Sequence, residues 1–221
     1  MPPGLGPAPA PRTRLASGRG QLAANRCPRC AFPIQGGCLC PAIPRLQVPW
    51  RIVVVRHASE IPRLTNTGRW AAAAIPGAII FDHALDDTRS DSELEALLDD
   101  GPAWLLYPSA QAGPPGGPPP RTLVIPDATW AQARRMVQRL APLRALPRLA
   151  LPPPTSAIRL RRPPRAGGMS TLEAIASALH LLGDVAAAGA LRTLHQAAVE
   201  KTLRLKGMWP PTHDHHRGET R

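Results

Sequence analysis

The chain has 221 residues with 27 basic and 15 acidic side chains, which gives a formal net charge of +12 at pH 7. This excess predicts a polyanionic partner, most simply a nucleic acid, and a basic protein without such a partner is the alternative. No apolar run approaches the length of a bilayer-spanning helix, which excludes a membrane-spanning class. We expect a soluble, cytoplasmic protein, because clustered thiols occur here without a secretory leader. Nothing in the sequence indicates an obligate protein partner.

Low-complexity segments flank the region that should fold. Residues 1–24 are rich in Pro, Gly, Ala and Arg and lack apolar periodicity, which predicts a disordered basic arm. Residues 210–221 contain three histidines and predict a flexible tail. We therefore expect one folded domain over residues 25–209, with residues 25–45 as a cysteine-rich appendage.

Four cysteines begin this domain in the pattern C-x2-C-x7-C-x-C, as Cys27, Cys30, Cys38 and Cys40. Two close pairs of soft ligands in a turn-rich segment match the tetrahedral preference of zinc, so the spacing predicts a zinc knuckle. Disulfide bonding and a redox role for the first pair are the alternatives. A closed four-sulfur site leaves no coordination position for substrate, so we expect the zinc to be structural.

Short strands alternate with helices through the middle of the chain. The pattern predicts strands at residues 51–57, 78–82, 103–107, 121–125 and 148–151. It predicts helices at residues 67–75, after residue 90, and at 129–140. This order is typical of an α/β fold with a mostly parallel sheet flanked by helices.

The C-terminal part of the domain should be helical. Ser170 and Glu173 form a capping-box pattern at the start of a helix whose apolar residues recur at helical spacing. A second helix is predicted at residues 185–205, after a glycine.

Polar clusters occur where a parallel sheet binds its ligands, beyond the carboxyl ends of strands. They are Tyr107-Pro108-Ser109, Asp127-Ala128-Thr129-Trp130, and Gly167-Gly168-Met169-Ser170-Thr171-Leu172-Glu173. From residue chemistry alone, Asp127 is either a catalytic carboxylate or the N-cap of the following helix. Trp130 suits a core position as well as a ligand platform. The capping box with Ser170 is enough to explain the presence of Glu173.

Five motifs together resemble the DTW-domain family, which is named for an Asp-x-Thr-Trp motif, and they occur in the family's order over about residues 26–205. They are the cysteine quartet, Thr65-Asn66-Thr67-Gly68-Arg69, Leu106-Tyr107-Pro108-Ser109, Asp127-Ala128-Thr129-Trp130 with Ala133-Arg134, and Ser170-Thr171-Leu172-Glu173-Ala174. The chain departs from the family at Ala128, where glycine is more usual, and this makes the local turn less permissive.

The resemblance implies a tRNA-uridine aminocarboxypropyltransferase related to the SPOUT class of α/β RNA-modifying proteins. Such enzymes transfer the 3-amino-3-carboxypropyl group of S-adenosylmethionine to N3 of a tRNA uridine and release 5′-methylthioadenosine. For that chemistry, Asp127 is the expected catalytic group, as the base or as the group that aligns N3. The expected S-adenosylmethionine-binding residues are Tyr107, Pro108, Ser109, Thr129, Trp130, Ser170, Thr171, Leu172 and Glu173.

Basic and polar side chains flank all three clusters, and we expect them to contact tRNA with salt-dependent affinity. They are Arg56, His57, Arg63, Asn66, Thr67, Arg69, Arg134, Arg159, Arg161, Arg162 and Arg165. A solvated basic face is the alternative for some of them.

Two other functional classes remain open at this point. A SPOUT-like methyltransferase would use the same donor and leave a methylated base. A non-catalytic zinc-ribbon RNA-binding protein would need the cysteines and the arginines, but it would not need Asp127, Ser170 or Glu173.

Overall fold

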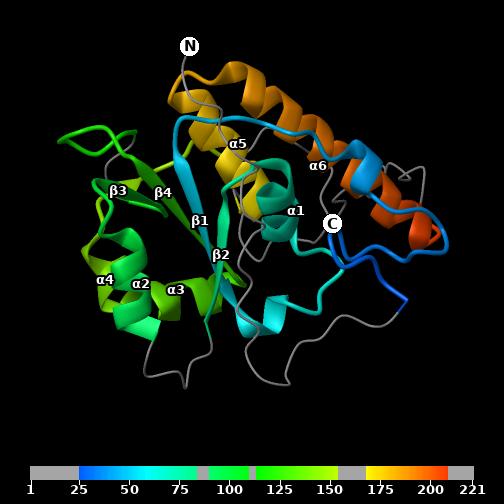
Figure 1. Ribbon diagram of the computed structural model, residues 1–221, viewed down its shortest axis with the longest axis horizontal. Helices are drawn as coiled ribbons and strands as arrows, with labels where there is room; N and C mark the ends of the chain where they lie inside the picture. The colour runs from blue at the N-terminus through cyan, green and yellow to red at the C-terminus, as the bar shows by residue number, and fades with distance from the viewer. Residues whose placement is uncertain (1–24, 84–89, 110–112, 154–167, 209–221) are drawn as a thin grey trace, which may run out of the picture.

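The computed structural model describes residues 25–83, 90–109, 113–153 and 168–208 (Figure 1). At its centre lies a five-stranded sheet of order β2-β1-β4-β3-β5, in which every neighbouring pair is parallel. The strands are β1 Arg51–His57, β2 Ile79–His83, β3 Ala103–Leu106, β4 Thr122–Asp127 and β5 Arg148–Leu149. The predicted α/β fold with a parallel sheet is confirmed. The predicted N-terminal arm and C-terminal tail lie outside the described residues.

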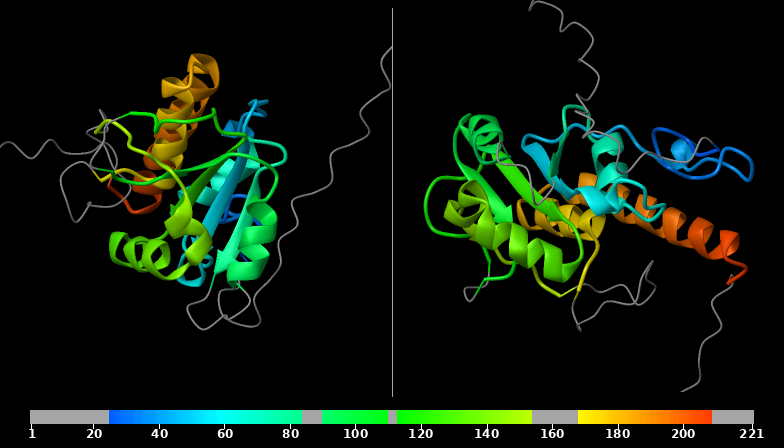
Figure 2. Two further views of the ribbon diagram at one scale, coloured as in Figure 1. Left: turned by 90° about the vertical axis from the view of Figure 1, so that its left-hand side faces the viewer. Right: turned by 90° about the horizontal axis from the view of Figure 1, so that it is seen from below.

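Helices cover both faces of the sheet (Figures 1 and 2). One face carries α1 Thr67–Ala74, α5 Thr171–Leu181 and α6 Val185–Leu205. The other carries α2 Ser90–Leu98, α3 Trp130–Arg139 and α4 Ala141–Ala145. The sequence pattern did not predict α4, because this helix has only five residues and contains a proline in its first turn. The described residues also contain two 3-10 helices, η1 Cys40–Ala42 and η2 Ala58–Glu60.

The β-branched run of β1 supplies both hydrophobic cores. Successive strand residues point to opposite faces of a sheet. Ile52 and Val54 accordingly enter the core beneath α1, α5 and α6, whereas Val53 and Val55 enter the core beneath α2, α3 and α4. A strand that is buried on both faces has a continuous apolar sequence, and for this reason β1 could be predicted with its observed bounds.

The cysteine-rich segment packs into the first of these cores and is not an appendage. Trp70 of α1 donates a hydrogen bond from Nε1 to the Cys30 carbonyl oxygen at 2.8 Å. Its ring centroid lies 5.6 Å from that of Phe32, and the Lys201 ammonium of α6 lies 5.9 Å from the Phe32 ring. Cys30 and Phe32 are fully buried, so α1 and α6 both hold this segment.

Within the described ranges, no helix combines the length and the apolar character needed to cross a membrane.

Candidate active site

The site lies at the carboxyl edge of the sheet, where β1 and β4 adjoin. The chain leaves β1 through η2 toward α1 on one face, and it leaves β4 into α3 on the other. Such a reversal leaves a crevice beyond the strand ends. A cavity of about 500 Å³ opens there, which is an ordinary size for a small-molecule site.

The three predicted clusters meet around this cavity. Asp127 lines it together with nearly all the predicted donor-binding residues, namely Tyr107, Pro108, Ser109, Thr129, Trp130, Ser170, Thr171 and Glu173. Leu172 is the exception, because its side chain is buried in the core. The Leu172 backbone N–H instead donates to Thr67 Oγ1 at 3.4 Å and so ties α5 to α1. Bringing these clusters together required long-range folding, since they come from three separate parts of the chain.

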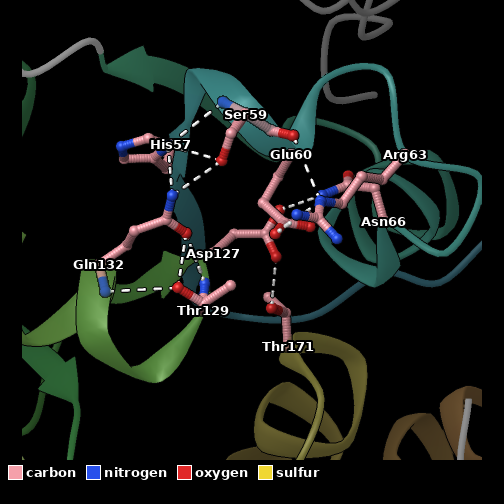
Figure 3. A network of polar contacts seen from close by, with 9 residues as sticks. All are labelled: His57, Ser59, Glu60, Arg63, Asn66, Asp127, Thr129, Gln132 and Thr171. Carbon is pink, nitrogen blue, oxygen red and sulfur yellow. Dashed lines mark hydrogen bonds and ion pairs between the residues drawn. The ribbon is translucent and has the colours of Figure 1, made fainter. Parts of the chain in front are cut away.

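Asp127 forms the buried centre of a hydrogen-bond network (Figure 3). Its side chain is 4% exposed, and its two oxygens accept one hydrogen bond each, from Asn66 Nδ2 at 2.5 Å and from Thr171 Oγ1 at 2.6 Å. Burial raises the pKa of Asp127 above its usual value, against the lowering effect of the bonds from Thr171 and Asn66. A carboxylate held in this way is oriented and readily accepts a proton.

Asp127 does not cap the helix that follows it. Thr129 is the N-cap of α3: its Oγ1 accepts from the Gln132 N–H at 3.4 Å, and Gln132 Oε1 accepts from the Thr129 N–H at 3.1 Å. The alternative prediction, in which Asp127 is a helix cap, is therefore wrong. Its carboxylate is committed to partners from α1 and α5.

The start of α1 approaches Asp127 so closely that only glycine fits. Asn66 caps α1 by accepting from the Arg69 N–H at 2.9 Å, while its amide donates to Asp127. A Cβ atom on Gly68 would lie 2.6 Å from Asp127 Oδ2 and 2.9 Å from Val54 Cγ1. The glycine in the Asn66-Thr67-Gly68 motif thus allows the helix to contact the carboxylate.

Two of the arginines predicted to bind tRNA are buried beside this network. Arg56 is 3% exposed and donates to both oxygens of Asp82, at 2.7 Å and 2.9 Å. Strand pairing places it between Asp82 and Asp127 along the sheet edge. Arg69 donates to the Ile61 carbonyl at 2.6 Å, and burial lowers its pKa to about 10, with further lowering by Arg56. Burial argues against direct tRNA contacts by Arg56 and Arg69, because neither guanidinium lies at the surface.

The remaining predicted tRNA-binding residues differ in position. Arg63 and Thr67 line the cavity, and Arg134 lies on α3. Arg63 and Arg134 are exposed and therefore open to a large ligand, whereas Thr67 is buried. Asn66 is buried and bonded to Asp127. The four arginines that precede the Ser170 cluster lie outside the described residues; they are Arg159, Arg161, Arg162 and Arg165.

His57 lies outside the cavity lining, on the α3 side of the network (Figure 3). Its Nδ1 is 2.8 Å from Ser59 Oγ and 3.3 Å from Gln132 Nε2. Burial lowers the pKa of His57, with Glu60 opposing this shift and Arg135 adding to it. His57 is therefore positioned to join β1 to the capping turn of α3, and its predicted contact with tRNA stays a prediction.

A second polar group closes the cavity from the α5 side. The predicted capping box is confirmed: the Ser170 N–H donates to Glu173 Oε2 at 2.8 Å, and the Glu173 N–H donates to Ser170 Oγ at 3.3 Å. His195 of α6 places Nε2 3.7 Å from Glu173 Oε2 and also lines the cavity. The sequence did not point to His195, because it lies within a mostly apolar helical stripe, or to Glu60, a cavity residue that belongs to no motif.

Two aromatic rings form part of the cavity wall. The ring centroids of Tyr107 and Trp130 are 6.5 Å apart, and the Arg148 guanidinium lies 5.4 Å from the Tyr107 centroid. Rings at this spacing offer flat apolar surfaces against which an adenine or a uracil can stack.

The four cysteines form a separate cluster that fits a zinc ion. Their Sγ atoms all lie within 4.8 Å of one another, with Cys27–Cys40 at 3.6 Å and Cys30–Cys38 at 3.2 Å, and all four are free thiols. Tetrahedral zinc with bonds of about 2.3 Å holds sulfurs at about 3.8 Å. Burial raises the pKa of Cys27, but the N–H groups of Cys30 and Arg29 and the neighbouring thiols outweigh it and lower the pKa to about 6. The disulfide alternative is not supported, because no pair is bonded.

The fold and site define an α/β protein with a ligand cavity at the strand ends and a four-thiolate knuckle built into its core. The chain belongs to the DTW-domain family, whose profile matches residues 24–203.

Relatives with established names extend this result. The chain is 30% identical over 168 residues to tRNA-uridine aminocarboxypropyltransferase 2 of Drosophila melanogaster, a match that covers 72% of this chain and 66% of the relative. It is 29% identical over 168 residues to the mouse (Mus musculus) protein of the same name, covering 71% and 56%. The chain thus spans between 56% and 66% of the length of these relatives. No solved structure matched the chain, so the relationship to SPOUT proteins stays a prediction.

Proposed function

We propose that the protein is a tRNA-uridine aminocarboxypropyltransferase that uses S-adenosylmethionine as donor and uridine N3 as acceptor. The observation that carries this proposal is the oriented, buried carboxylate of Asp127 at a cavity of small-molecule size. Family membership and the names of the relatives support the same reaction.

The electrostatics of the cavity suit this donor. Among the described residues, three carboxylates line the cavity, those of Glu60, Asp127 and Glu173, against one guanidinium, that of Arg63. This acidic wall occurs in a protein of net charge +12. A sulfonium donor that also carries an ammonium group is attracted by such a wall, whereas a free phosphate is repelled.

Asp127 is the proposed base. In the reaction the bond between uridine N3 and the donor γ-carbon forms, and the bond between that carbon and sulfur breaks, with its electron pair going to sulfur. The N3 proton passes to Asp127, and 5′-methylthioadenosine leaves as a neutral thioether. The positive charge of a bound donor favours the ionised form of Asp127, and Asn66 and Thr171 hold its oxygens in place.

The rest of the cavity serves binding and orientation. Tyr107 and Trp130 are the proposed platforms for the adenosine and uracil rings. The first turn of α5 would hold the donor carboxylate, since the positive end of the helix dipole attracts anions. Arg63 and Arg134, with the basic surface generally, would hold the tRNA backbone. Zinc would be bound by the four cysteines and would stabilise the fold.

Product analysis tests the proposal. Purified protein, S-adenosylmethionine and unmodified tRNA should yield 5′-methylthioadenosine and a uridine heavier by the aminocarboxypropyl group, as read by mass spectrometry. The matched variant Asp127→Asn should bind donor and tRNA but form neither product. S-adenosylhomocysteine and a methylated base would identify a methyltransferase instead, and tRNA binding with neither product would indicate a non-catalytic RNA-binding protein.

A further inference from the structure

Glu173 lines the cavity, and one of its two carboxylate oxygens has no hydrogen-bond partner among the described residues. Glu173 Oε2 accepts from the Ser170 N–H and faces His195, but within the described part of the chain Glu173 Oε1 is buried and accepts no hydrogen bond. Buried acceptors in native proteins are nearly always paired. The capping box accounts for one oxygen of Glu173 and leaves the other unexplained.

The other two carboxylates of the cavity are already engaged. Both oxygens of Asp127 accept hydrogen bonds, and Glu60 forms an ion pair with Arg63 at 3.2 Å. Glu173 therefore carries the acceptor that is left to pair with a cationic group of the ligand.

His195 helps to orient the carboxylate of Glu173. It is 4% exposed on α6, within a helix face that is otherwise mostly apolar, and its Nε2 lies 3.7 Å from Glu173 Oε2. With the Ser170 N–H on the same oxygen, the side chain is held from two elements. The terminal torsion of a glutamate is soft, so a small rotation can turn Oε1 toward a ligand without breaking the cap.

We propose that Glu173, oriented by Ser170 and His195, binds the α-ammonium group of the donor's amino-acid portion. The inference rests on the proposed function for the identity of the donor. An acceptor that water does not reach gives a strong, charge-assisted hydrogen bond to an ammonium group. Holding the amino-acid portion at Glu173 and the adenosine near Tyr107 fixes the carbon chain between them, which would direct its γ-carbon toward the nucleophile.

Three ligands separate this role from others. S-adenosylmethionine and S-adenosylhomocysteine both carry the α-ammonium group, whereas 5′-methylthioadenosine lacks the amino-acid portion. The affinity of the full-length protein for each is measured by calorimetry, for the wild type and for Glu173→Gln. Glutamine keeps an oxygen acceptor for the Ser170 N–H and removes only the charge. Glu200→Gln, on the exposed surface of α6, is the matched control.

Glu173→Gln should weaken S-adenosylmethionine and S-adenosylhomocysteine alike, by about ten-fold to a hundred-fold, as expected when one charged hydrogen bond is lost. It should leave 5′-methylthioadenosine within about two-fold, and Glu200→Gln should change none of the three. Unchanged affinities, an equal loss for all three ligands, or a loss confined to the sulfonium ligand would each overturn the assignment.

A second variant covers the case in which Glu173→Gln does not fold. His195→Asn should give the same pattern with a smaller loss, and an equal loss for all three ligands would show a merely structural role. Failure of the proposed function is read separately, from the wild-type product assay. A wild-type protein that methylates tRNA would refute the aminocarboxypropyl transfer. The role of Glu173 in binding the ammonium group would still be decided by the three measured affinities.

Discussion

Replacing Gly68 with alanine tests whether the contact between α1 and Asp127 sets the geometry of catalysis. The new Cβ would lie 2.6 Å from Asp127 Oδ2, 2.8 Å from its Cγ and 2.9 Å from Val54 Cγ1. An ordinary contact begins at 3.4 Å, so either the carboxylate or the helix must retreat by about 0.8 Å. Val54 is fully buried and Asp127 is bonded on both sides, so neither neighbour can rotate away.

The size of the effect follows from these contacts. Overpacking of a buried site costs about 1–3 kcal/mol, and for a domain of this length this lowers Tm by about 2–12 °C. A displacement of about 1 Å at a catalytic group reduces turnover by about a hundred-fold. We therefore expect Gly68→Ala to lower kcat for aminocarboxypropyl transfer by about two orders of magnitude, as measured by methylthioadenosine release.

Gly189→Ala is the control for this experiment. Gly189 lies within α6 and has no atom within 4 Å of the site where its Cβ would stand. Alanine is favoured over glycine in a helix by about 1 kcal/mol, so this variant should keep full activity and gain slightly in Tm. A Gly68→Ala enzyme with wild-type kcat and Tm would refute the argument that this glycine is required by close approach.

Two further predictions concern Asp127 and the metal. Burial raises the folded-state pKa of Asp127, so its contribution to stability is present at low pH and is lost as pH rises through that pKa. Asp127→Asn should accordingly match or exceed the wild-type Tm at pH 7, and this difference in Tm should shrink toward about pH 4. Wild-type activity should rise with pH through an apparent pKa above the ordinary aspartate value of about 3.9. An Asp127→Asn protein that is destabilised and still active would contradict both predictions. Metal analysis should find one zinc per chain, lost in Cys38→Ser together with at least about 10 °C in Tm, because zinc–thiolate binding contributes to folding directly. A zinc-free Cys38→Ser protein with normal Tm and activity would show that the knuckle does not stabilise the fold.

Local patterns in the sequence were sufficient for most elements of the fold. β1 and α6 were predicted with their observed bounds, because an apolar run between polar residues and a long helical periodicity are properties of neighbouring residues. The capping box of Ser170 and Glu173 was predicted for the same reason. α4 was missed because five residues carry too little periodicity.

The residues of the candidate site were largely predicted, but the contacts between their side chains were not. The three clusters were placed at one sheet edge by the rule for parallel strands, and the cysteine spacing predicted the thiolate cluster. The role of each side chain could not be predicted in this way. The sequence shows that Arg56 is basic, but only the fold shows that it is buried and bonded to Asp82.

The sequence alone determined the α/β class, the positions of the strands and most helices, and the four thiolates, since each depends on residues within about one element of each other. Only the tertiary structure decided that Asp127 is held by Asn66, 61 residues away, and by Thr171, 44 residues away. It likewise paired Glu173 with His195. These partners are set by how α1, α5 and α6 pack on the sheet, and packing depends on the shape of the whole core, which no local pattern encodes.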